Sequence, residues 1–127
     1  MANLFVTAIN CMDGRVQEPI ISYMKGRFGA DYVDMITEPG PVAIIADPSG
    51  DARVPGIRAR AEISVNKHGS AVVAVVGHDD CAGNPAPPTV QQRQVRASVE
   101  AVKQWHPEVN VIGLWVDDNW DVSELER

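Results

Sequence analysis

The sequence predicts a single α/β domain with a central, mainly parallel sheet of four strands in the order 2-1-3-4, flanked by helices. Apolar runs of strand length occur at residues 4–9, 32–36, 71–76 and 109–116. Helical patterns separate each run from the next, and parallel neighbours need such crossovers. Most of the runs are continuously apolar rather than alternating, which is typical of strands that are covered on both faces.

The totals of the chain limit both its architecture and its partners. A length of 127 residues suits one domain with one core, so residues 1–127 are expected to form a single unit. No apolar run approaches the roughly 20 residues that a membrane helix needs, so no membrane partner is expected. The N-terminus lacks a signal-peptide pattern, which predicts a cytoplasmic protein. The net charge of −6 argues against nucleic acid as a partner.

Three helices are expected between the strands. Their apolar residues recur at helical spacing, and residues that favour helix ends bound them. The expected segments are residues 17–28, 55–68 and 89–105. Thr89, followed three residues later by Gln92, forms a capping-box pattern at the start of the third helix. Residues 37–55 are rich in Pro, Gly and Asp and are expected to form a long loop, and residues 117–127 a polar tail.

Candidate metal ligands follow two of the predicted strands. Cys11 comes directly after the first apolar run, and His78 and Cys81 come after the third. If the first and third strands are neighbours, these residues meet beyond the carboxyl ends of the strands, where parallel sheets bind ligands. Two thiolates and one imidazole favour Zn²⁺ over magnesium or calcium, and three ligands leave a fourth position open for catalysis. The sequence therefore predicts a catalytic zinc site.

Asp13 and Arg15 are the predicted catalytic residues. On an extended loop, residues 11, 13 and 15 project to the same side, so these two side chains are expected to line the cavity of the metal. An arginine can hold a carboxylate through two hydrogen bonds and keep it ionised, and the carboxylate can then orient a water molecule. A simple salt bridge in a loop is the alternative for this pair.

Two further groups of residues are expected to support this site or the core. Asp79 and Asp80 either cap the turn after the third strand or orient the imidazole of His78. The three tryptophans are expected to anchor the core or an interface: Trp105, Trp115 and Trp120. Exposure of the last two would favour a homodimer.

Two segments of the chain resemble the signature motifs of the β-class carbonic anhydrases. These segments are CMDGR at residues 11–15 and GHDDCAG at residues 77–83. The resemblance covers most of the chain and implies a sheet of order 2-1-3-4 and dimers that build the active site at their interface. It also implies that Cys11, His78 and Cys81 bind zinc, and that Asp13 and Arg15 form a catalytic dyad.

The activity implied by the resemblance is the reversible hydration of carbon dioxide to bicarbonate by a zinc-bound hydroxide, in a homo-oligomer that is a dimer or larger. Related β-class folds hydrolyse carbonyl sulfide or carbon disulfide, and these neutral linear molecules are alternative substrates. Two other classes of protein stay open. The chain could be a zinc-stabilised binding or regulatory module without turnover, or a redox protein that uses Cys11 and Cys81 as a thiol pair.

Overall fold

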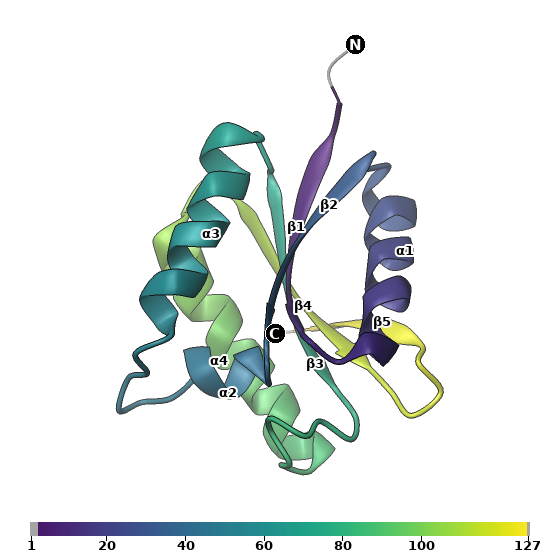
Figure 1. The fold of residues 1–127 in the computed structure, drawn as a ribbon, viewed down its shortest axis with the longest axis vertical. Helices are drawn as coiled ribbons and strands as arrows, with labels where there is room; N and C mark the ends of the chain where they lie inside the picture. Colours follow the sequence, from purple (N-terminus) through teal and green to yellow (C-terminus); the bar gives the residue numbers. More distant parts are fainter. Residues whose placement is uncertain (1–2, 127) are drawn as a thin grey trace.

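The computed structural model describes residues 3–126, which form one five-stranded sheet of order β2-β1-β3-β4-β5 (Figure 1). The strands are β1 (Phe5–Cys11), β2 (Tyr32–Glu38), β3 (Val72–His78), β4 (Asn110–Val116) and β5 (Val122–Leu125). The strands β1 to β4 are parallel to one another, and β5 runs antiparallel to β4. The predicted class and the order 2-1-3-4 are confirmed. The sequence predicted four strands followed by a polar tail, whereas the structure has a fifth strand in that segment, because β5 pairs with the edge of β4.

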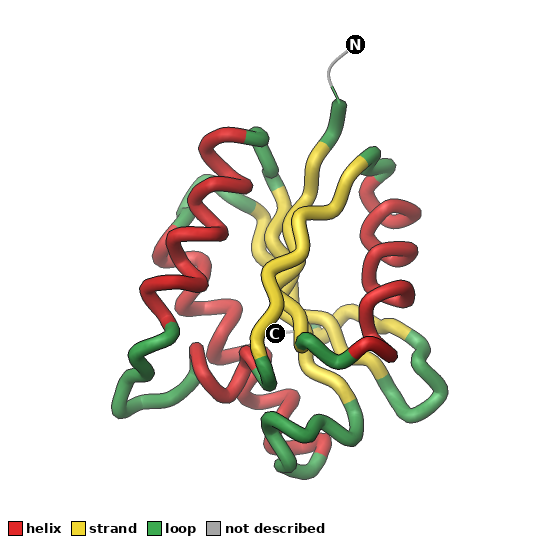
Figure 2. Tube along the Cα trace, viewed as in Figure 1, coloured by secondary structure: helices red, strands yellow, loops and turns green. Residues whose placement is uncertain are grey.

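Helices cover both faces of the sheet (Figure 2). One face carries α1 (Gln17–Phe28), and the other carries α2, α3 and α4, as Figure 1 shows. Their bounds are Pro41–Ile45 for α2, Val54–Lys67 for α3 and Pro88–Trp105 for α4. None of the helices in the described part of the chain is long and apolar enough to cross a membrane.

Two local expectations were wrong for reasons of backbone geometry. The segment of residues 37–55 is not a continuous loop, since β2 extends to Glu38 and α2 follows Gly40, whose φ is 63°. The capping box does not form, because α4 begins at Pro88 after an N-cap at Pro87 that makes no side-chain hydrogen bond. Proline is pre-organised for the first helical position, which places Thr89 inside the first turn.

The core consists of two clusters, one on each face of the sheet. Successive residues of a strand point to opposite faces, so Ile9 packs with α2, α3 and α4 while Ala8 belongs to the cluster that contains α1 residues. Glycines let α4 approach the strands closely. A Cβ on Gly77 would lie 2.8 Å from Val95 Cγ2, and one on Gly113 would lie 2.7 Å from Val95 Cγ1. The strands are thereby buried on both sides, as their apolar sequences predict.

Candidate metal centre and active site

The sheet topology brings the three predicted metal ligands together. β1 and β3 are neighbours, so Cys11 at the end of β1 lies beside His78 at the end of β3. Cys81 follows in the turn after β3. One potential ligand atom from each residue lies within 4.8 Å of the other two, and all three residues are buried. Among residues 3–126, this is the one group of three or more such donors.

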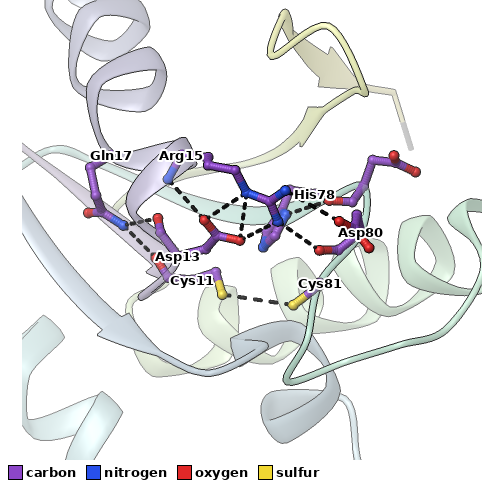
Figure 3. Close-up of polar contacts among 8 residues, drawn as sticks. Cys11, Asp13, Arg15, Gln17, His78, Asp80 and Cys81 are labelled. Atoms are coloured by element: carbon purple, nitrogen blue, oxygen red, sulfur yellow. Dashed lines mark hydrogen bonds and ion pairs between the residues drawn. The ribbon is translucent and has the colours of Figure 1, made fainter.

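The geometry of the three donors fits a tetrahedral zinc ion. The two Sγ atoms are 3.8 Å apart (Figure 3). Two sulfurs at about 2.3 Å from a tetrahedral ion would be separated by about the same distance. Nδ1 of His78 lies 2.8 Å from the carbonyl oxygen of Asp79, and donating to it leaves Nε2 as the nitrogen with a free lone pair. That Nε2 atom is buried and has no hydrogen-bond partner.

The imidazole is therefore oriented by a backbone carbonyl and not by a carboxylate. The sequence suggested that Asp79 or Asp80 orients His78. The main-chain carbonyl of Asp79, and not an aspartate side chain, makes this contact. A second buried imidazole nitrogen without a partner, Nε2 of His106, lies outside the donor group. An unpaired nitrogen alone does not define a metal site, whereas the unpaired nitrogen of His78 lies beside two thiols.

The two thiols lie 3.8 Å apart, and either sulfur can be the donor in the hydrogen bond between them. This contact outweighs burial and lowers the pKa of the Cys11 thiol. The same contact, together with burial, raises the pKa of the Cys81 thiol. Backbone hydrogen bonds from Gly40 and Asp13 also favour the Cys11 thiolate. The pair is thus prepared to offer negative charge to a cation.

Asp13 and Arg15 form the predicted contact through a turn and not through an extended loop. Asp13 is the N-cap of a short 3-10 helix, η1 (Gly14–Val16), and its Oδ1 accepts a hydrogen bond from the Arg15 backbone N–H at 2.9 Å. The guanidinium of Arg15 donates to the same carboxylate from Nε at 3.1 Å and from Nη2 at 2.7 Å. These hydrogen bonds lower the pKa of the Asp13 carboxyl to about 2, so it is ionised at neutral pH.

Two side-chain amides that the sequence reasoning missed fix this segment. Gln17 donates from Nε2 to the carbonyl oxygens of Cys11 at 2.7 Å and Asp13 at 2.9 Å. Asn10 is fully buried, donates to the carbonyl of Val16 at 3.1 Å and accepts from the N–H of Cys11 at 2.9 Å. The sequence signal for this role was the position of Asn10 directly before the CMDGR segment and of Gln17 two residues after it.

The turn after β2 packs tightly against the loop that carries Cys81. A Cβ on Gly83 would lie 2.7 Å from the carbonyl carbon of Pro39, and a Cβ on Gly40 would lie 2.7 Å from Cβ of Asn84. No real side chain tolerates such distances to backbone atoms without a shift of the chain. The glycines at residues 40 and 83 therefore allow this turn to lie directly beside the loop that carries Cys81.

A family described as "Putative carbonic anhydrase" matches residues 1–126 of the chain. The chain belongs to this carbonic anhydrase family. The predicted family is confirmed, and family and fold make the protein a carbonic anhydrase-like lyase. A search of curated proteins found no match.

Solved structures show that this carbonic anhydrase family member has the β-class fold. One of two tetrameric β-carbonic anhydrases from Sordaria macrospora is 14% identical, with a TM-score of 0.69 over 100% of this chain and 83% of that chain. The carbonic anhydrase of Streptococcus mutans is 18% identical, with a TM-score of 0.67 over 95% and 81%. A carbon disulfide hydrolase is 14% identical, with a TM-score of 0.63 over 97% and 79%.

Proposed function

We propose that this protein catalyses the reversible hydration of carbon dioxide to bicarbonate and a proton, with zinc held by Cys11, His78 and Cys81. The buried Cys-His-Cys group carries the proposal, because its sulfur spacing and its unpaired Nε2 atom fit a tetrahedral ion with one position left for water. Membership of the carbonic anhydrase family supports the choice of reaction.

The chain's own residues would prepare the reacting water in this mechanism. When bound, zinc supplies Lewis acidity that makes hydroxide available near neutral pH. Asp13 would accept a hydrogen bond from the reacting water and orient its oxygen lone pair toward the carbon atom. Arg15 keeps the carboxylate of Asp13 ionised and prevents it from rotating freely. Burial of the two sulfurs keeps bulk water away from the donor set.

An oligomer and a cytoplasmic location are part of the proposal. The two β-carbonic anhydrases of Sordaria macrospora are tetrameric, which supports assembly of this chain. Met12 lies directly after the ligand Cys11 and is 62% exposed, so it offers an apolar surface to a second subunit at the edge of the site. Trp115 gives no such support, because it is buried in the core.

Carbon disulfide is the second candidate substrate, with carbonyl sulfide as its relative. A carbon disulfide hydrolase shares the fold over 97% of this chain. Carbon dioxide, carbonyl sulfide and carbon disulfide are all neutral and linear, and each has a carbon that a hydroxide can attack. The same donor group and the same pair of Asp13 and Arg15 would therefore serve either reaction.

The test combines metal content with turnover. We expect about one zinc per chain by mass spectrometry and proton release from carbon dioxide in stopped-flow assays, with both lost in Cys81→Ser. Sulfide release from carbon disulfide or carbonyl sulfide, without turnover of carbon dioxide, would show that the second candidate substrate is the correct one. Stoichiometric zinc without either reaction would favour the binding module. Absence of zinc, with a Cys11 to Cys81 disulfide in the purified protein, would favour the redox protein and overturn the proposal.

A further inference from the structure

Two residues with an unusual backbone conformation converge on Arg15. Among residues 3–126, Asp80 and Trp120 are the non-glycine residues with positive φ, at 55° and 63°. The guanidinium of Arg15 lies 4.7 Å from the centre of the Trp120 ring. It also donates from Nη2 to the carbonyl oxygen of Asp80 at 3.0 Å. The left-handed conformation is costly for a residue with a large side chain, and such outliers are concentrated at functional sites.

The turn between β4 and β5 holds Trp120 in this conformation. The carboxylate of Asp117 accepts hydrogen bonds from the backbone N–H groups of Asn119 at 2.9 Å and Asp121 at 3.0 Å. The carbonyl of Asp117 accepts from the N–H of Trp120 at 3.0 Å, and its own N–H donates to the carbonyl of Asp121 at 3.0 Å. These four hydrogen bonds within residues 117–121 fix the turn, and the turn positions the Trp120 ring.

Asp80 approaches the same guanidinium from the loop between the metal ligands His78 and Cys81. Figure 3 shows Arg15 between the carboxylates of Asp13 and Asp80. The Asp80 carboxylate is 3.3 Å from Nη1, but its side chain is 79% exposed, so this ion pair contributes little. The carbonyl of Asp80 and the ring of Trp120 also contact the guanidinium, and neither contact requires a second exposed charge.

Arg15 needs such support. Its side chain is 46% exposed, and a long, exposed side chain loses conformational entropy whenever it is held in one geometry. Asp13 alone fixes one edge of the guanidinium. The guanidinium lies over the ring of Trp120, which limits its movement toward that side. The carbonyl of Asp80 accepts a hydrogen bond from Nη2 and holds a second edge of the guanidinium. Together the three contacts leave one orientation of the guanidinium.

We propose that Trp120 and Asp80 are positioning residues that hold Arg15 in the orientation in which it binds Asp13. The hairpin of β4 and β5 is then part of the active site and not only the end of the sheet. This inference rests on the proposed function, in which Asp13 orients the reacting water. It assigns a role in that function to a segment that follows the last parallel strand.

Two substitutions at Trp120 distinguish the effect of its ring from the effect of the turn that contains it. Trp120→Phe keeps an aromatic face, whereas Trp120→Asn removes the ring and tolerates a left-handed backbone. We expect the Asn variant to lose about five- to tenfold in kcat with KM nearly unchanged, and the Phe variant to stay within about twofold of wild type. The reverse ranking would show that residue 120 serves the turn alone and would overturn the inference.

The double variant tests whether Trp120 acts through Arg15. In an Arg15→Ala background, Trp120→Asn is expected to cause no further loss of kcat, because the group that it positions is already absent. Full additivity of the two losses would overturn the inference. Trp105→Leu is the matched control, because the centre of the Trp105 ring lies 5.9 Å from the guanidinium of Arg58, on the face of the sheet that α2, α3 and α4 cover. Its kcat should equal that of wild type.

A readout without turnover distinguishes this inference from the proposed function. In the NMR spectrum of the zinc-loaded protein, the Nε–H proton of Arg15 should show a ring-current shift that disappears in Trp120→Asn and persists in Trp120→Phe. If the protein hydrates no substrate while this shift is present, the proposed function fails and the contact stands without a catalytic role. If turnover is present but the shift is absent, the inference fails alone.

Discussion

The chain contains the pattern Asp-x-Arg twice, at residues 13–15 and 51–53, and the two copies have the same local geometry. In each, an aspartate oxygen accepts from the arginine backbone N–H at 2.9 Å. In each, Nε and Nη2 of the guanidinium bind the carboxylate, at 3.1 and 2.7 Å in the first copy and 3.0 and 2.8 Å in the second. Both carboxyls have a pKa lowered to about 2 by the arginine.

The surroundings of the two copies differ. Asp13 follows the candidate ligand Cys11 by two residues at the end of a buried strand, and Arg15 also contacts Asp80 and Trp120. The second copy lies before α3, and the guanidinium of Arg53 has no hydrogen-bond partner other than Asp51 within residues 3–126. The hydrogen bonds within an aspartate–arginine pair therefore do not distinguish the two copies. Their neighbours do: Cys11 lies beside the first copy in the sequence, and the tertiary structure adds Asp80 and Trp120.

The largest expected difference between the copies is in turnover. In the proposed mechanism, Asp13→Asn removes the carboxylate that orients water, and it should lower kcat about a hundredfold or more while zinc stays bound. Asp51→Asn makes the same change of charge in a copy that is not adjacent to a candidate ligand in the sequence, and it should change kcat less than about twofold. Stopped-flow kinetics with metal analysis checks both. Equal losses in the two variants would break the comparison.

Two glycines extend the comparison to packing: Gly83, two residues after Cys81, and Gly50, directly before the second copy. Gly83→Ala places a Cβ 2.7 Å from a backbone carbon of Pro39, so the Cys81 loop must move. We expect a loss of about 1–3 kcal/mol in the free energy of unfolding and weaker zinc binding. Gly50→Ala meets no neighbour within 4 Å but has a φ of 81°, so it should lose about 1–2 kcal/mol and bind zinc normally. Denaturant unfolding measures the stability of both variants, and zinc titration measures their affinity for the metal. Equal zinc affinity in the two variants would contradict this prediction.

Acid should remove the stabilisation that the second copy provides. Hydrogen bonds from Arg53 lower the pKa of Asp51 from 3.8 to about 2. A carboxyl whose pKa is lower in the folded state stabilises the protein above the unfolded pKa and loses this effect as pH falls through the folded pKa. The stability difference between wild type and Asp51→Asn should thus be constant from neutral pH to about pH 4 and shrink below it. It is small, because the pair is exposed. A difference that grows in acid, measured by urea unfolding, would contradict this assignment.

The smallest effect is expected for Gly14→Ala, which makes the first copy identical to the second, Asp-Ala-Arg. A Cβ at residue 14 meets no atom within 4 Å, and the backbone there has no positive φ. We expect kcat within about twofold of wild type and a change in unfolding free energy within about 0.5 kcal/mol. A large loss of activity with zinc retained would mean that the local sequence, and not its surroundings, distinguishes the copies.

Much of the fold, and the proximity of the three candidate metal donors, could be predicted from the sequence. A strand buried on both faces needs apolar residues at nearly every position, so β1, β3 and β4 stand out as continuous runs. Cys11 and His78 come at the ends of two of these runs, and parallel neighbours end at the same edge of the sheet. β5 could not be predicted in this way. It has four half-exposed or exposed residues, and it forms because the edge of β4 offers unpaired backbone groups.

The sequence by itself determined the parallel strands with their crossover helices and the identity of the donors, because burial and ligand chemistry depend on residue type. The tertiary structure alone decided that Asp80 and Trp120 contact the arginine of the first Asp-x-Arg copy. The physical reason is that these contacts join segments distant along the chain. They also depend on a left-handed backbone at Trp120, which the conformational preference of a bulky residue does not predict.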